Sequence, residues 1–103
     1  MNDTEYLVLA ETLYHKIEDA IEASEADIDY DQNGSLLTLE FDNRSKLIIN
    51  RQQPLHQIWL ATPENGHHYD YIDEKWIDNR SGDEFLHFLS NAIYKQSEQT
   101  VSF

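Results

Sequence analysis

The feature that most constrains this fold is a change in the period of the apolar residues after position 26. Residues 3–23 repeat apolar side chains at three- and four-residue spacing, which predicts an amphipathic helix. From Ile28 onward apolar and polar residues alternate, as is typical of half-buried strands. These alternating segments follow one another too closely for parallel crossovers, so the sequence predicts a helix followed by antiparallel strands.

Six short strands are predicted. Their ranges are 27–31, 36–41, 46–50, 57–61, 68–71 and 75–78. Asn33-Gly34 is expected to form a two-residue hairpin turn, and Asn65-Gly66 marks a second turn. A last helix is predicted from about Gly82 to Ser97, opened by a capping box between Ser81 and Glu84.

This order of elements predicts an α+β fold. The simplest packing is a two-layer α-β sandwich, in which both terminal helices cover one face of a sheet of about six antiparallel strands. A chain of 103 residues suffices for one hydrophobic core, so we expect a single domain over residues 1–103.

Acidic residues dominate the charge of the chain. It has 20 Asp and Glu against 7 Lys and Arg, a net charge of −13, and no cysteine. Such a charge repels nucleic acids and anionic membranes and favours cations and basic protein surfaces. With no cysteine, the chain forms neither disulfides nor thiolate metal sites. No segment has the pattern of a membrane span or targeting peptide, so we expect a cytoplasmic protein.

Ten of these acids, with a single base, lie in residues 1–31. All of them except Asp3 and Glu5 form a candidate metal site on shared faces of the predicted helix and strand, together with one histidine. Its residues are Glu11, His15, Glu18, Asp19, Glu22, Glu25, Asp27, Asp29 and Asp31. Exposed carboxylates suit Fe²⁺, Fe³⁺, Mn²⁺, Mg²⁺ or Ca²⁺, bound weakly and with little selectivity. The alternative is a solvated face without a ligand.

Trp59 is a second candidate, for partner binding. In the strand 57–61, alternation sends Ile58 and Leu60 toward the helices, and Trp59 with Gln57 toward the uncovered face. An exposed Trp is a candidate contact anchor, although it could also lie flat over its neighbours.

The remaining histidines and polar residues give weaker signals. His67-His68 follows a turn and is expected to be a pair of loop residues, with metal binding as the alternative. His56 and His87 have no evident partner. No arrangement of nucleophile and base is evident, and exposed carboxylates are poor general acids at neutral pH, so a non-enzymatic protein is expected.

Three sequence motifs make this chain resemble the bacterial frataxin family. They are N-R-Q-Q-P-L-H-Q-I-W-L-A at residues 50–61, W-x-x-x-R-S-G from Trp76 to Gly82, and T-V-S-F at the end. The resemblance covers essentially the whole chain. It implies an α-β sandwich that binds iron weakly, as Fe²⁺ or Fe³⁺, at an acidic ridge on the first helix and strand. It also implies binding to a cysteine desulfurase and modulation of assembly on the iron–sulfur scaffold protein.

The resemblance also implies roles for individual residues. The acids of the candidate metal site other than Glu25 match the ridge of the family, and Trp59 matches its exposed sheet Trp. Partner binding is expected to involve Glu18, Asp19, Glu22, Gln57 and Trp59. The expected function is modulation of iron–sulfur cluster assembly, by iron delivery or by regulation of the desulfurase. An acidic interaction or inhibitor domain with incidental cation binding is the alternative. We expect a monomer, or oligomers induced by metal.

Overall fold

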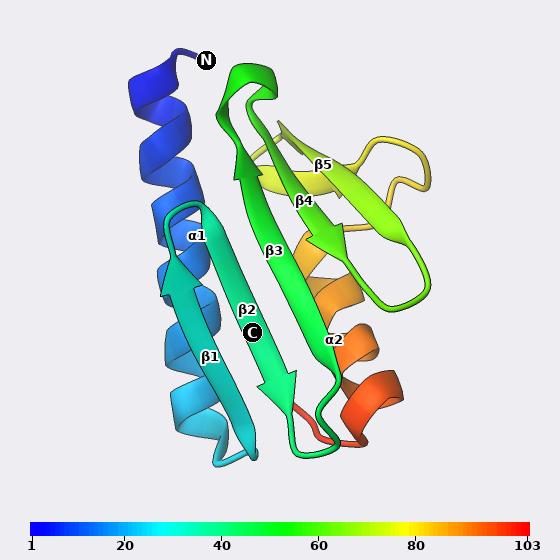
Figure 1. Cartoon of the computed structure of the whole chain (residues 1–103). Coiled ribbons are helices and arrows are strands. Elements are labelled where there is room, and N and C mark those ends of the chain that lie inside the picture. Colours follow the sequence, from blue (N-terminus) through cyan, green and yellow to red (C-terminus); the bar gives the residue numbers. More distant parts are fainter.

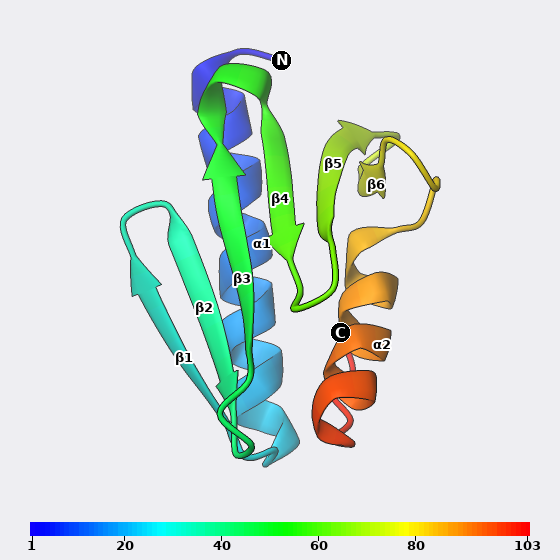
Figure 2. The same ribbon diagram turned by 45° about the vertical axis from the view of Figure 1, so that its right-hand side comes forward.

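The computed structural model describes residues 1–103 and contains two helices and one six-stranded sheet. The elements are α1 (Asp3–Ser24), β1 (Ile28–Asn33), β2 (Leu36–Phe41), β3 (Lys46–Gln52), the 3₁₀ turn η1 (Gln53–Leu55), β4 (Gln57–Ala61), β5 (Gly66–Ile72), β6 (Lys75–Asp78) and α2 (Phe85–Ser97). The strands lie in sequential order and all neighbours are antiparallel. Figures 1 and 2 show α1 and α2 on the same side of the sheet. The predicted two-layer sandwich is confirmed.

Helix α1 begins with a capping box between Asn2 and Glu5, in which each side chain accepts a hydrogen bond from the other's backbone N–H. Its buried side chains include Tyr6, Leu13 and Ile17 and form the predicted apolar stripe. The helix ends at Glu25, which has the left-handed conformation with a φ of 60°. The acidic face of α1 is therefore carried by a helix that is anchored along its whole length.

The hairpin between β1 and β2 differs by one residue from the prediction. Asn33 pairs with Leu36, so the two-residue loop is Gly34-Ser35 rather than Asn33-Gly34. Gly34 has a φ of 62°, which glycine adopts without the steric cost of a side chain, and therefore it occupies the first loop position. This shift leaves Ile28 and Tyr30 facing the helices and Asp29 and Asp31 facing away from them.

The start of α2 also differs from the prediction. The helix begins at Phe85, and the side chain of Glu84 caps it by accepting hydrogen bonds from the N–H groups of Leu86 and His87. The predicted capping box with Ser81 is wrong, because Gly82 has a φ of 79° and turns the chain before the helix starts. Ser81 instead accepts a hydrogen bond from the N–H of Asp83.

One hydrophobic core of 20 buried residues lies between the two layers. Ile58 and Leu60 of β4 are buried in it, as their alternation predicted. Two tyrosines of α1 also cross to the sheet, where the hydroxyl of Tyr6 donates to the carbonyl of Gln57 and that of Tyr14 to the carbonyl of Ser35. Neither helix is long and apolar enough to span a membrane.

Candidate metal and partner-binding sites

The predicted metal-site residues of α1 lie on the helix face opposite the core. Glu11, His15, Asp19 and Glu22 are exposed and Glu18 is partly exposed. Pairs within this set at three- and four-residue spacing, such as His15 with Asp19 and Glu18 with Glu22, lie next to each other on that face, away from the buried apolar stripe. The helix therefore displays these groups to solvent and buries none of them.

Tyr30 of β1 connects this face to the sheet. Its hydroxyl donates a hydrogen bond to the carboxylate of Glu22. This bond, together with the charges of Glu22, Glu18 and Asp19 and the partial burial of the ring, raises the pKa of Tyr30 to about 12. The carboxylates at positions 18, 19 and 22 thus lie close to β1, as expected if that strand starts beside the end of α1.

The aspartates of β1 lie on the other side of the same strand. Since Ile28 and Tyr30 point toward the helices, Asp29 and Asp31 point to the open face of the sheet. β1 is an edge strand, so the two groups of acids line both sides of one edge of the molecule. We call the surface formed by the predicted metal-site residues of α1, β1 and the turn between them the acidic edge.

Sequence reasoning missed one acid of this region. Glu40 of β2 is directly opposite Asp29 on the open face. Like charges in this position destabilise strand pairing, and here Lys46 of β3 lies opposite Glu40 on its other side. The alternation within β2 could have revealed this acid. Thr38 and Glu40 alternate with buried Leu37, Leu39 and Phe41, which places Glu40 on the open face, like Asp29.

The turn between α1 and β1 holds the last two predicted metal-site residues. Glu25 is the left-handed C-cap of α1, and its side chain is exposed. The side-chain amide of Gln99 hydrogen-bonds to both the N–H and the carbonyl of Asp27. The backbone of Asp27 is therefore fixed by the C-terminal segment, and its carboxylate remains exposed.

The acidic edge brings the predicted ligands into one region without gathering them at one point. No three Asp, Glu or His side chains anywhere in the chain converge into a preformed metal site. A cation on this surface would keep much of its hydration shell and contact few carboxylates at a time. Such an arrangement favours weak and unselective binding.

Trp59 lies on the open face of the sheet, as predicted, but it is half-buried rather than fully exposed. Its ring stacks on the ring of His68 in β5, with centroids 4.1 Å apart and an interplanar angle of 11°. Its indole N–H donates to the side-chain oxygen of Gln57 at 2.8 Å, and the Gln57 amide donates to Asp70 at 3.0 Å. These four residues form a fixed platform, which we call the Trp59 platform.

His68 and Asp70 were not predicted to belong to this surface. His67 and His68 are not loop residues, because β5 begins at Gly66 and includes both. The register pairs Trp59 with His68 and Gln57 with Asp70. Only this pairing brings the four side chains together, and the sequence of neither strand specifies it.

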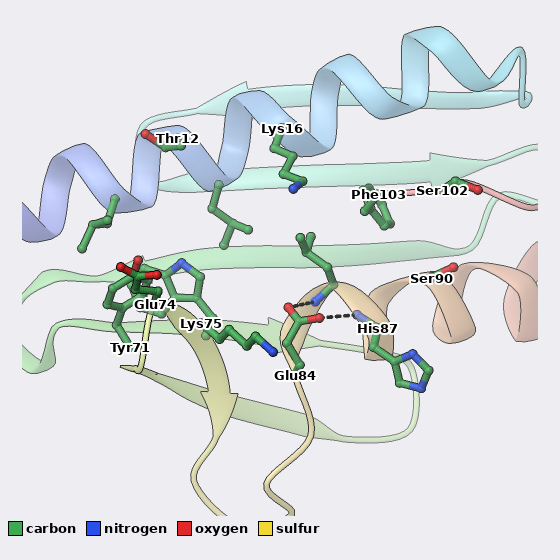
Figure 3. A pocket seen from close by; sticks show the side chains of 14 residues that line it. Thr12, Lys16, Tyr71, Glu74, Lys75, Glu84, His87, Ser90, Ser102 and Phe103 are labelled. Carbon is green, nitrogen blue, oxygen red and sulfur yellow. Dashed lines mark hydrogen bonds between the residues drawn. The ribbon is translucent and has the colours of Figure 1, made fainter.

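A groove of about 660 Å³ lies between α1, α2, the β5–β6 turn and the C-terminal residues, separate from both predicted sites (Figure 3). No residue of the acidic edge that was predicted to bind metal lines it, and no residue of the Trp59 platform does so.

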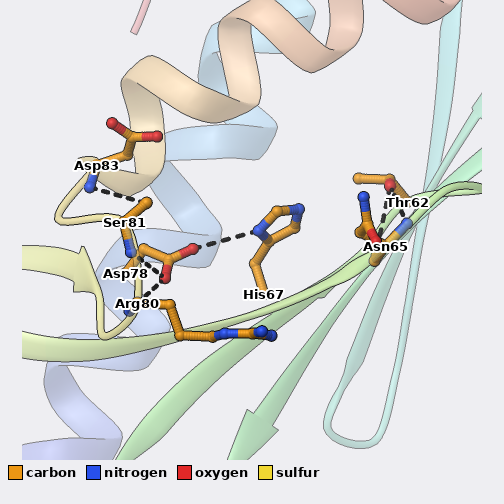
Figure 4. Close-up of polar contacts among 7 residues, drawn as sticks. All are labelled: Thr62, Asn65, His67, Asp78, Arg80, Ser81 and Asp83. Carbon is orange, nitrogen blue, oxygen red and sulfur yellow. Dashed lines mark hydrogen bonds and ion pairs between the residues drawn. The ribbon is translucent and has the colours of Figure 1, made fainter.

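His67 points to the opposite side of β5 from His68. Its Nδ1 lies 3.2 Å from Asp78, a buried carboxylate that also accepts hydrogen bonds from the N–H groups of Arg80 and Ser81 (Figure 4). The ring also packs against Phe88 of α2, at 4.5 Å between centroids. This contact ties β5, the loop after β6 and α2 together, so His67 has a structural role.

His56 has a partner that the sequence did not reveal. Its Nε2 lies 2.7 Å from the carboxylate of Asp3, and its ring stacks on Tyr6 at 5.1 Å. The hydrogen bond from His56 lowers the pKa of Asp3. The pair joins the start of α1 to the turn before β4.

Comparison with known proteins assigns the family. The family model described as a frataxin-like domain matches residues 1–99. The chain belongs to the frataxin family. This membership confirms the resemblance seen in the three motifs. It also fits a sheet of six antiparallel strands with both helices on one face.

Relatives and solved structures agree with this assignment. The chain is 74% identical over its full length to the iron-sulfur cluster assembly protein CyaY of Psychromonas ingrahamii, covering 98% of that protein. It is 56% identical to CyaY of Colwellia psychrerythraea, over 99% of this chain and 96% of the relative.

Among solved structures, frataxin from Psychromonas ingrahamii matches with a TM-score of 0.96 at 74% identity, over 99% of this chain and 97% of that one. Trimeric frataxin from Saccharomyces cerevisiae, complexed with ferrous iron, matches with a TM-score of 0.70 at 27% identity, over 96% of this chain and 88% of that one. The fold is thus shared with a relative of much lower identity.

Proposed function

We propose that this protein takes part in iron–sulfur cluster assembly, as a non-enzymatic iron-binding protein that delivers iron or regulates a cysteine desulfurase. The observation that carries the proposal is the acidic edge, where carboxylates from α1 and β1 line both sides of an edge strand. The CyaY relatives are named for iron–sulfur cluster assembly, and yeast frataxin has been crystallised with ferrous iron. A cytoplasmic location is part of the proposal.

Iron is the cargo in this proposal. The candidate ligands are the carboxylates of the acidic edge, with His15 as an added nitrogen donor. Because they are exposed and do not converge, we expect an affinity in the micromolar range or weaker, and other divalent or trivalent cations should substitute. The chain has no cysteine, so an iron–sulfur cluster would be held by the partner and not on thiolates of this protein.

Two partner surfaces follow from the geometry. The acidic edge can attract a basic surface of the desulfurase over a distance, which would make association fast and sensitive to salt. The Trp59 platform lies on β4 and β5, several strands away from β1, and is held by stacking and hydrogen bonds. It can provide a short-range contact to the assembly of desulfurase and scaffold protein.

A paramagnetic NMR titration tests the metal site. Mn²⁺ or Co²⁺ should broaden amide signals between Glu11 and Asp31 first, together with Glu40. Broadening confined to His67 and His68 would contradict the assignment.

A triple charge reversal of Glu18, Asp19 and Glu22 to Lys tests the partner surface. It should slow association with the desulfurase and flatten the salt dependence of that association. Equally fast binding of this variant at low salt would show that the acidic edge is not the docking surface.

The alternative of an acidic interaction or inhibitor domain is favoured by one observation, the lack of a converging ligand set. In that case cations would bind only as a diffuse atmosphere. Broadening by Mn²⁺ would then fall with NaCl concentration along the whole edge in parallel. Under the favoured proposal, some resonances should stay broadened at 150 mM NaCl.

A further inference from the structure

The groove between the two helices has an apolar floor. Leu13 and Trp76 are buried at its base, and Leu9, Leu86 and Phe103 form its partly buried walls. These side chains come from α1, β6, α2 and the C-terminal residues, so the groove exists only in the folded protein. Its volume of about 660 Å³ lies within the range of small-molecule sites.

The rim of this groove carries three of the few basic groups in an acidic protein. Lys16 comes from α1, Lys75 from β6 and His87 from α2. Figure 3 shows the side chains of Lys16 and Lys75 reaching toward the same part of the groove. Neither lysine makes an ion pair, although the chain has 20 acids. Both ammonium groups are therefore free to pair with a ligand.

Two carboxylates also line the groove, and they differ in whether the protein already hydrogen-bonds their oxygens. Both oxygens of Glu84 accept hydrogen bonds from N–H groups at the start of α2, at 2.8 and 3.2 Å. Its charge is therefore partly balanced by the helix N-terminus. Glu74 lies in the β5–β6 turn and makes no ion pair. Glu74 is thus the acid of the groove that can be neutralised without disturbing the start of α2.

We propose that this groove binds a small amphipathic carboxylate. Its alkyl chain would lie on the floor formed by Leu13, Trp76 and Leu86, and its carboxylate between Lys16 and Lys75. The apolar floor of the groove favours binding of the alkyl chain, and the unpaired ammonium groups select an anionic headgroup over a neutral or cationic one. This site is independent of the acidic edge and of the Trp59 platform, so the proposal goes beyond the proposed function.

Three eight-carbon probes with different headgroups test the proposal. They are octanoate, octanol and octyltrimethylammonium, each titrated into the labelled protein at 150 mM NaCl and followed by NMR. We expect saturable shifts at the Trp76 indole and at the amides of Leu13 and Leu86, with octanoate at least tenfold tighter than the ammonium probe. Lengthening the alkyl chain of the carboxylate probe should tighten its binding about threefold per added methylene. Equal affinity of the three probes, shifts without saturation or shifts centred on Trp59 would overturn the proposal.

Variants then test the headgroup contacts. The double variant Lys16→Gln with Lys75→Gln should weaken octanoate about tenfold and leave octanol unchanged. Arg44→Gln with Lys46→Gln is the matched control, because it also removes two positive charges, from residues outside the groove. Glu74→Gln should strengthen octanoate two- to threefold. Unchanged octanoate affinity in the double variant, with thermal melts showing that it is folded, would refute the proposed binding mode.

Discussion

Asp78 and the acids of the acidic edge carry the same carboxylate group in opposite surroundings. Asp78 is 4% exposed and accepts hydrogen bonds from two backbone N–H groups and from His67. The predicted ligands of the acidic edge are mostly exposed, and among their carboxylates only that of Glu22 accepts a hydrogen bond, from Tyr30. Asp78 therefore stabilises the fold, whereas the exposed acids remain available for cations and partners.

The Trp59 platform combines features of both regions. Like Asp78, its side chains are fixed by specific contacts. Like the acidic edge, it lies on a surface that no other element covers, since both helices pack on the opposite face of the sheet (Figure 1). Fixed and accessible side chains lose little entropy on binding, which suits a short-range contact better than long-range attraction.

The largest expected effect is a loss of stability when the buried carboxylate is removed. Asp78→Ala should lower the free energy of unfolding by about 3 kcal/mol, because it leaves two N–H groups and His67 without their acceptor. Urea denaturation measures this change. Asp31→Ala, the control on the exposed side, should change stability by about 0.5 kcal/mol or less. Similar losses in the two variants would remove the distinction between the two regions.

Trp59→Ala should have its main effect on binding. We expect the complex with the desulfurase–scaffold assembly to lose about 2 kcal/mol, through faster dissociation with an unchanged salt dependence. The free energy of unfolding should fall by about 1 kcal/mol or less, because the ring is half-buried outside the core. Surface plasmon resonance over a salt series, with parallel melts, measures both. Unfolding of the variant would show that the ring supports the fold instead.

The loss of folding stability at acidic pH should depend on Asp78 in particular. Burial alone would raise its pKa, but the hydrogen bonds from Arg80, Ser81 and His67 outweigh burial and hold the pKa below the ordinary value of 3.8. Its contribution is therefore complete above about pH 4 and is lost as pH falls through the lower folded-state pKa. The stability difference between wild type and Asp78→Asn should shrink over that range in urea titrations at stepped pH. A difference independent of pH would contradict this assignment.

The smallest effect is expected from neutralising the acidic edge. Glu18→Gln, Asp19→Asn and Glu22→Gln should each raise stability by a few tenths of a kcal/mol, because they relieve repulsion on one helix face. Millimolar Mg²⁺ or added NaCl should raise the Tm of the wild type more than the Tm of a variant that combines these three substitutions. Differential scanning calorimetry checks this. A wild-type Tm unaffected by either salt would mean that the acids do not repel one another measurably.

Local patterns were sufficient to predict most of the fold. The apolar spacing of residues 3–23 matches α1, and the alternation in residues 57–61 correctly assigned the two faces of β4. Failures occurred where backbone conformation decided the outcome. Gly34 and Gly82 adopt positive φ values that displaced a predicted turn by one residue and a predicted helix start by three. Composition alone does not indicate which glycine will do so.

The sequence by itself determined the acidic character of the first helix and strand and the outward direction of Trp59, because both follow from periodicity along a single element. Only the tertiary structure decided what those residues meet. Strand register brought His68 to Trp59 and Glu40 to Asp29, and the pairing of β5 with β6 brought His67 to Asp78. Contacts between distant segments depend on the register and packing of whole elements, which no local pattern contains.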